Sequence, residues 1–178
     1  MKRQVFFIIL LVSLAFSACG TEPDSAESLI AYFLDVGQAK STLVVCWGQA
    51  MLIDGGNASD SDFIYTFLKK QGITRLDYVV ATRAHSDYVG GLAGALNYTR
   101  ADVIFCPVTT YDTSAFESFL RYISEQGKTI TVPKAGDKFM LGGAEVLVLG
   151  SVFPADGANH TNDDSIVLRV VYGKTISV

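Results

Sequence analysis

The side chains best suited to chemistry lie in one short stretch, ATRAHSDYVGGL, at positions 81–92. His85 and Asp87 are one residue apart and directly follow an apolar run that we expect to form a strand. An imidazole nitrogen and a carboxylate oxygen are common ligands of Zn²⁺, which can activate a bound water molecule for hydrolysis. The spacing predicts a metallohydrolase loop in which both residues bind metal and Asp87 also serves catalysis. An ordinary surface loop is the alternative.

Two neighbours in this stretch weaken the metal hypothesis. Arg83 and Tyr88 occupy the positions where two further ligands would be needed. A guanidinium has no accessible lone pair and does not deprotonate, and a phenol keeps its proton at neutral pH. A dication about 4 Å from a guanidinium is repelled by roughly 8 kcal/mol at an effective dielectric constant of 20. Arg83 and Tyr88 therefore argue against tight metal binding by this stretch.

Polar residues also end three other predicted strands, in the segments LDVGQAKS (34–41), LIDGG (52–56) and NHTNDDS (159–165). Singly, each has an ordinary explanation, because aspartate before glycine commonly forms a turn and an acidic loop is commonly solvated. Together they would gather at strand ends, where sites on layered α/β folds tend to form. The candidate cleft residues are Asp35, Gln38, Asp54, Asn162 and Ser165.

The elements that must position these residues follow from apolar periodicity and glycine punctuation. Helical spacing predicts helices at 61–72, with Ser61 as N-cap and Gly72 as stop, at 88–98 and at 113–127. Short β-branched runs predict strands at 29–37, 41–48, 50–56, 76–83, 101–108, 128–132, 137–141, 144–150 and 165–173. This order favours an α/β or α+β sandwich, a mixed sheet flanked by helices. The chain stops at Val178 in the run-up to a further strand, so we expect either a truncated domain or a frayed edge strand.

The N-terminus has the pattern of an export signal. Residues 1–18 combine two basic residues with an apolar stretch of about twelve, too short to span a bilayer but typical of a signal peptide. The small residues before Cys19 resemble a bacterial lipoprotein signal, so we expect Cys19 to carry lipid. Residues 19–28 would then be a flexible tether and 29–178 the folded domain, held outside the cytoplasm on a membrane. A non-lipidated secretory signal or an uncleaved anchor is the alternative.

Charge and cysteine content limit the partners. Loss of residues 1–18 would leave 12 basic and 18 acidic residues, a net charge of −6 instead of −4. Such a chain repels polyanions, and no basic patch is evident, so generic electrostatic binding to nucleic acid is not expected. Cys46 and Cys106 lie in apolar runs without ligand spacing, which predicts buried free thiols rather than a disulfide.

The order FLDVGQ, LIDGG, LDYVV, T-x-x-H-x-D-x-x-G-G-L and N-x-x-S-I-V-L-R resembles the metallo-β-lactamase fold. Within that fold it most resembles the soluble hydrolase-like domain of ComEC/Rec2 competence proteins, over residues 29–178. The resemblance implies a four-layer αβ/βα sandwich with metal, Zn²⁺ or Mn²⁺, held at the edges of two sheets. It also implies a phosphodiester or nucleic-acid substrate.

The family loop, T-H-x-H-x-D-H-x-G-G, maps its histidines onto Arg83, His85 and Tyr88 and its aspartate onto Asp87. Each implied metal therefore keeps one loop ligand. Lys40 replaces the acid of the family's G-Q-G-D-S segment. The strand that would carry the bridging aspartate would begin near Thr175, and the chain ends before such an aspartate is reached. His160 matches no family ligand.

These departures predict a hydrolase relative with a degraded, weak or inactive site. The alternative is a non-enzymatic extracytoplasmic lipoprotein that binds an anion or a partner. Arg83 and Lys40 would then lie close together in the cleft where the family binds its metals.

Overall fold

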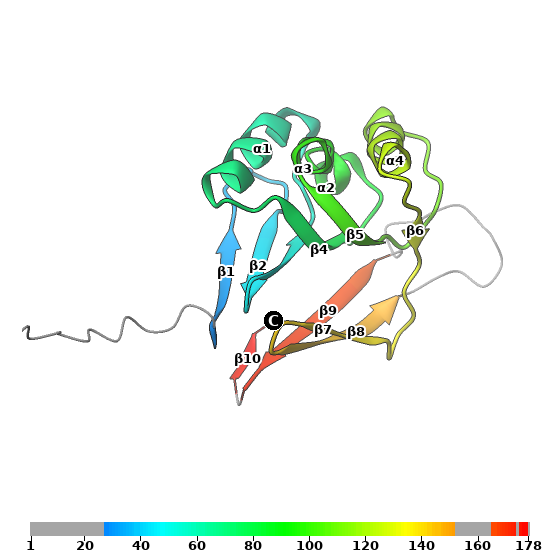
Figure 1. The fold of residues 1–178 in the computed structure, drawn as a ribbon. Helices are drawn as coiled ribbons and strands as arrows, with labels where there is room; N and C mark the ends of the chain where they lie inside the picture. The colour runs from blue at the N-terminus through cyan, green and yellow to red at the C-terminus, as the bar shows by residue number, and fades with distance from the viewer. Residues whose placement is uncertain (1–26, 152–164, 174, 178) are drawn as a thin grey trace, which may run out of the picture.

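The computed structural model describes residues 27–151, 165–173 and 175–177. Cys19, Asn162 and His160 therefore lie outside the described residues, as does the predicted signal. Two β-sheets face each other, and helices cover the outer side of the first sheet (Figure 1).

The first sheet has six strands in sequence order, β1-β2-β3-β4-β5-β6. Its first three strands pair antiparallel and its last three pair parallel with their predecessors. The parallel pairs require crossovers, and the helices supply them. The strands are β1 Leu29–Phe33, β2 Thr42–Cys46, β3 Gln49–Ile53, β4 Arg75–Val80, β5 Arg100–Phe105 and β6 Ile130–Thr131.

Four α-helices connect the parallel strands and pack on one face of that sheet (Figure 1). A short 3-10 turn, η2 Ala58–Asp60, precedes the first of them. The helices are α1 Ser61–Lys70, α2 Ser86–Val89, α3 Leu92–Tyr98 and α4 Ser114–Glu125. None of the helices in the described residues is long and apolar enough to cross a membrane.

The second sheet is antiparallel, in the order β10-β9-β8-β7. Its strands are β7 Lys138–Leu141, β8 Ala144–Ser151, β9 Ile166–Tyr172 and β10 Thr175–Ser177. The described ranges thus form three layers, helices, first sheet and second sheet, and they contain no helix on the outer side of β7–β10 (Figure 1).

Two apolar cores follow from side-chain alternation along the first sheet. In β3, Ala50 and Leu52 face the helices, whereas Met51 and Ile53 face the second sheet. Because both faces are covered, these strands are apolar throughout. Cys46 and Cys106 are buried and free in the two cores, as predicted.

A corner contact joins the two sheets at the end of the β2–β3 hairpin. Trp47 adopts a left-handed φ of 51° and packs against Gly143, and its Nε1 donates a hydrogen bond to the Tyr172 hydroxyl at 3.1 Å. The Tyr172 hydroxyl in turn donates to the carbonyl oxygen of Glu27. We call Trp47, Gly143 and Tyr172 the tryptophan corner.

The predicted α/β sandwich is confirmed, with corrections to individual elements. The helix predicted at 88–98 is two helices, α2 and α3, separated by Gly90 and Gly91. The strand predicted at 29–37 ends at Phe33, because the chain turns at Gly37, whose φ is 66°. Ser61 is the first residue of α1 and Asp60 the N-cap, whereas Gly72 follows the helix end with a φ of 69°, as predicted.

Candidate functional site

The candidate site lies where the loops after β3 and β4 meet, at the carboxyl ends of two parallel strands. These are the positions at which ligands commonly bind in α/β sheets. Gly55 N donates to the Tyr88 carbonyl at 2.7 Å, and Gly56 N donates to the Lys40 carbonyl at 2.8 Å. These bonds join the 34–41, 54–57 and 81–91 loops into one unit.

Glycines allow this close approach of backbones. A Cβ on Gly91 would overlap the Gly55 carbonyl oxygen and lie 3.0 Å from its carbon. A Cβ on Gly55 would lie 2.8 Å from the Gly91 carbonyl carbon, closer than real Cβ contacts. The two Gly-Gly pairs that the sequence shows are therefore required by packing, whatever the chemistry of the loops.

Asp54 is the buried centre of the site, with only 3% of its surface exposed. Its carboxylate accepts hydrogen bonds from both the backbone N and the Oγ1 of Thr82, each at 2.7 Å. Burial raises the pKa of Asp54 to about 7, although the Thr82 hydrogen bonds and nearby Lys40 lower it and Asp87 adds a small rise. The side chain is thus directed at the start of the loop, where it positions Thr82.

An intersheet cleft of about 560 Å³ opens beside Asp54. Its polar side is formed by Asp54, Thr82, Ser41 and Lys40, and its opposite side is formed by β9. Ile166 N donates to the Thr82 carbonyl at 2.9 Å and so ties the second sheet to the loop. The Ser41 hydroxyl donates to the Asp54 carbonyl oxygen at 3.0 Å. Thr82 and Ser41 were missed as site residues from the sequence; their places directly beside strand ends were the available signal.

His85 is the N-cap residue of α2, and Asp87 lies in the first turn of that helix. The His85 ring lies edge-on to the ring of Tyr111, with centroids 5.3 Å apart. Asp87 is exposed. Within residues 27–151, 165–173 and 175–177, no three His, Cys, Asp or Glu side chains gather into a group that could hold a metal.

Two cations lie around Tyr88, the residue at the last histidine position of the predicted loop. The Arg83 Cζ is 5.6 Å and the Lys40 Nζ is 6.0 Å from the Tyr88 ring centroid. Both distances are within the range of cation–π contacts. Lys40 and Arg83 therefore both lie against one ring, that of Tyr88.

The remaining predicted cleft residues are only partly brought together. The Asp35 carboxylate accepts a hydrogen bond from Gly37 N at 3.3 Å, so Asp35 stabilises a turn, and neither it nor the exposed Gln38 lines the cleft. Ser165 is half-buried and directly precedes β9 at the cleft wall.

Burial raises the pKa of Cys106 to about 12, and Asp54 contributes a smaller rise. Cys106 therefore stays a neutral thiol.

Comparison with known proteins identifies the fold. Several solved structures resemble the chain: a metallo-β-lactamase from Cronobacter sakazakii with a HARLDQ motif is 16% identical, with a TM-score of 0.52 over 83% of this chain and 56% of that one. The metallo-β-lactamase SMB-1, bound to 2-mercaptoethanesulfonate, is 14% identical, with a TM-score of 0.55 over 82% and 60%. CmlA, a diiron β-hydroxylase from Streptomyces venezuelae, is 18% identical, with a TM-score of 0.50 over 87% and 29%.

At these identities the structural likeness shows the fold alone, and the chain spans about 60% or less of the length of these relatives. No curated protein matches the chain significantly. Residues 34–177, most of the chain, match the model of the Metallo-beta-lactamase superfamily. Members of that superfamily generally depend on zinc or iron. The chain therefore belongs to the metallo-β-lactamase superfamily of hydrolase-fold proteins.

Proposed function

We propose that this chain is a ComEC/Rec2-like member of the superfamily whose metal centre is degraded, so that it hydrolyses phosphodiesters negligibly or not at all. The observation that carries the proposal is the pair of cations, Arg83 and Lys40, around Tyr88. Arg83 and Tyr88 stand where the family loop has two histidines, and Lys40 stands where the family's G-Q-G-D-S segment has an acid.

The residues present do not fit a two-metal site. A catalytic zinc takes three protein ligands and a water, and each additional metal needs its own set. His85 and Asp87 offer one donor to each implied metal, and the Asp54 carboxylate already accepts two hydrogen bonds from Thr82. We assign no step of a reaction to a metal in this chain.

The HARLDQ relative supports the idea that the fold tolerates such changes. Its motif and the RAHSDY stretch of this chain have the same length, and both have aspartate at the fifth position and an arginine. Both also lack histidine at the sixth position. Substitution of the ligand positions is thus compatible with a stable fold of this type.

The finer parts of the proposal rest on sequence motifs. FLDVGQ and LIDGG support the ComEC/Rec2-like assignment and with it a phosphodiester or nucleic-acid type of ligand. The signal-like N-terminus supports an extracytoplasmic protein that is anchored to a membrane by lipid on Cys19.

The test combines activity with metal content. We expect the purified chain to show no turnover of bis-p-nitrophenyl phosphate with added Zn²⁺ or Mn²⁺, and to retain less than one zinc per chain. Arg83→His with Tyr88→His should raise zinc retention, whereas Arg100→His, at an exposed position of β5, should not. Robust, EDTA-sensitive turnover by the unaltered chain would contradict the proposal.

A second function, binding of an anion without chemistry, is favoured by one specific observation. Lys40, Ser41 and Thr82 line the polar side of the intersheet cleft, and Lys40 and Arg83 both lie against the Tyr88 ring. Lysine and arginine side chains are suited to bind a phosphate group, whereas the Ser41 and Thr82 hydroxyls already donate to Asp54.

For this second function, inorganic phosphate or adenosine monophosphate should raise the melting temperature of the chain, with EDTA present. Lys40→Met with Arg83→Met should abolish the shift, and Lys69→Met with Arg100→Met, both exposed residues outside the cleft, should preserve it. Absence of any shift with the unaltered chain would exclude the anion site.

A further inference from the structure

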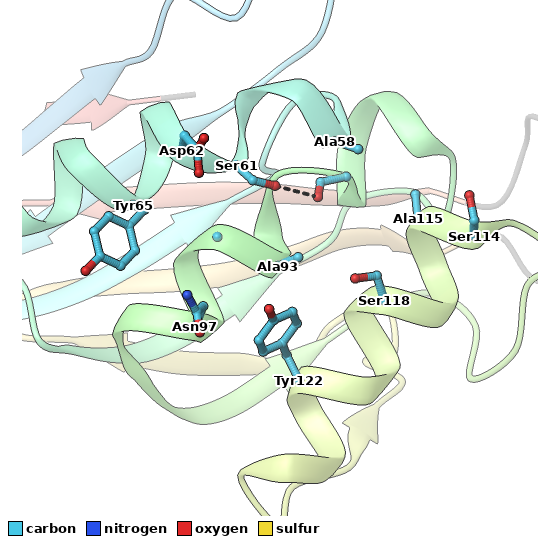
Figure 2. Close-up of a pocket in the computed structure, with 12 residues that line it drawn as sticks. Ala58, Ser61, Asp62, Tyr65, Ala93, Asn97, Ser114, Ala115, Ser118 and Tyr122 are labelled. Atoms are coloured by element: carbon cyan, nitrogen blue, oxygen red, sulfur yellow. Dashed lines mark hydrogen bonds between the residues drawn. The ribbon is translucent and has the colours of Figure 1, made fainter.

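A second pocket, of about 360 Å³, lies in the helix layer and not between the sheets (Figure 2). It is lined by α1 and α4 on its two sides and by α3 along its floor. We call it the helix-layer pocket. Nothing in the superfamily loop or in the proposed function uses it, and its volume is within the lower part of the range for small-molecule sites.

The pocket exists because the middle helix is short and small. Gly94 of α3 packs directly on α1, where an added Cβ would overlap the Ser61 carbonyl oxygen and lie 2.6 Å from its carbon. The α3 residues that line the pocket besides Gly94 are Ala93 and Asn97, so the floor is low. The longer α1 and α4 stand on either side of α3, and their side chains form the walls (Figures 1 and 2).

The walls carry hydrogen-bonding groups that are not used within the protein. Five polar side chains of the lining make no hydrogen bond to another residue in the described part of the chain. They are Asp62, Tyr65, Asn97, Ser118 and Tyr122. Asn97 lies between Tyr65 and Tyr122 at one end of the pocket (Figure 2). The lining includes one carboxylate and no basic side chain.

The two aromatic rings are held by their own neighbours. The Tyr98 ring packs edge-on against Tyr65 with centroids 5.1 Å apart, and the Lys69 Nζ lies 5.9 Å from the Tyr65 centroid. The Arg121 Cζ is 4.5 Å from the Tyr122 centroid. Ordered rings lower the entropy that a ligand would lose on binding.

These features define the chemistry of a ligand. A carboxylate and an amide oxygen accept hydrogen bonds from hydroxyl groups, serine and tyrosine hydroxyls both donate and accept, and aromatic rings pack against C–H faces. Asp62 is the one charged side chain of the lining, which itself offers an anion no cationic partner, since Lys69 and Arg121 lie against the Tyr65 and Tyr122 rings but do not line the pocket. We propose that the helix-layer pocket binds an uncharged saccharide of one or two rings.

The test is titration of the full chain with glucose, N-acetylglucosamine and maltose, followed by isothermal calorimetry and by amide NMR shifts. At least one of them should bind saturably with a Kd of about 1 mM. Ala93→Phe, which fills the floor, and Asn97→Ala, which removes the amide, should each weaken binding about tenfold or more. Thr66→Phe, on the exposed side of α1 outside the pocket, should leave the Kd unchanged.

Comparing a neutral sugar with an anionic one distinguishes binding in this pocket from nonspecific sugar contacts. Glucuronate should bind at least about fivefold more weakly than glucose, and Asp62→Asn should remove most of that difference because it removes the repelling carboxylate. The proposal is overturned if no sugar binds, or if binding is unchanged in both Ala93→Phe and Asn97→Ala. Circular dichroism of each variant identifies any that fails to fold, and Asn97→Ala then decides alone.

Discussion

At the scale of single residues, the site is organised by a buried acid and by glycine contacts. Asp54 was predictable as a strand-end aspartate, but its partner was not, because the Thr82 hydrogen bonds join residues 28 positions apart in the chain. The Gly-Gly pairs were visible in the sequence as turn residues. Their real role, direct contact between the 54–57 and 81–91 loops, depends on tertiary packing that a local pattern does not encode.

Asp54 should make the chain less stable as pH rises. Its folded pKa of about 7 exceeds the ordinary value of 3.8, so the folded state holds a proton that the unfolded state has released between these values. The free energy of unfolding should therefore fall by about 3 kcal/mol between pH 4 and 7 on account of this residue, at 1.36 kcal/mol per pKa unit. About one pH unit above the folded pKa both states are ionised and the effect is constant.

Urea unfolding from pH 4 to 8 tests this, with Asp54→Asn as the key variant. The amide keeps the shape and can still accept from Thr82 N, so its stability should decline less steeply with pH than that of the unaltered chain. Asp112→Asn, at an exposed residue, should leave the slope unchanged. Parallel curves for the chain and Asp54→Asn would contradict the prediction.

Gly91→Ala should destabilise the chain strongly, because the new methyl group would overlap the Gly55 carbonyl oxygen. Overpacking typically costs about 1–3 kcal/mol and more where backbone must move, so we expect a loss of at least 3 kcal/mol or no folding. The matched control is Gly150→Ala, whose Cβ would meet nothing closer than 4.0 Å and should change stability by less than about 1 kcal/mol. Equal effects of the two substitutions in thermal unfolding would show that the close approach is not rigid.

At the scale of elements, apolar runs separated by glycine locate the strands well, but they do not fix the strand ends. The 128–132 run was predicted as a strand and contributes only Ile130–Thr131 to the sheet. Helix α4 shows how an end is fixed instead. Gln126 caps it and donates from Nε2 to the carbonyls of Leu96 and Thr99 at 2.8 Å, while its Oε1 accepts from Ala101 N at 2.9 Å. A single amide thus joins α3, α4 and β5.

Replacing Gln126 should loosen this junction. Gln126→Ala removes three hydrogen bonds to half-buried backbone groups, and at about 0.5–1.5 kcal/mol each we expect a loss of about 2–4 kcal/mol in the free energy of unfolding. Glu125→Ala, which removes only the exposed ion pair with Arg121, should cost less than about 1 kcal/mol. Chemical denaturation of both variants measures the difference, and similar losses would rule out a special role for Gln126.

At the scale of the whole molecule, the sheets are joined at both ends of the sandwich: by the Ile166–Thr82 hydrogen bond beside the cleft, and by the tryptophan corner. The fold class was predictable because both sheets follow from local apolar patterns. The grouping of Lys40 and Arg83 around Tyr88 was predictable only through the resemblance to a known loop. The helix-layer pocket was not predictable at all, since it arises from how the short α3, with its small side chains, packs between the longer α1 and α4.

The outer face of the second sheet leaves apolar side chains exposed. Met140 is 53% and Leu149 is 49% exposed, on a face that no helix of residues 27–151, 165–173 or 175–177 covers. Full burial of such a side chain is worth roughly 1.5–3 kcal/mol, so this face should promote self-association. Met140→Lys with Leu149→Lys should shift the chain toward monomer in light scattering at high concentration. Phe63→Lys, on α1, should not, and an unchanged distribution in the double variant would show that this face is inert.

The tryptophan corner also provides an intrinsic fluorescence signal for the packing of the two sheets. Trp47 is the single tryptophan of the chain, and it lies half-exposed against the second sheet, remote in sequence from its partner Tyr172. Its emission will therefore change when the two sheets separate. Ionisation of Asp54, at the opposite end of the sandwich, should leave that emission unaltered. Tryptophan fluorescence can thus follow sheet separation in an unlabelled sample without a contribution from the ionisation of Asp54.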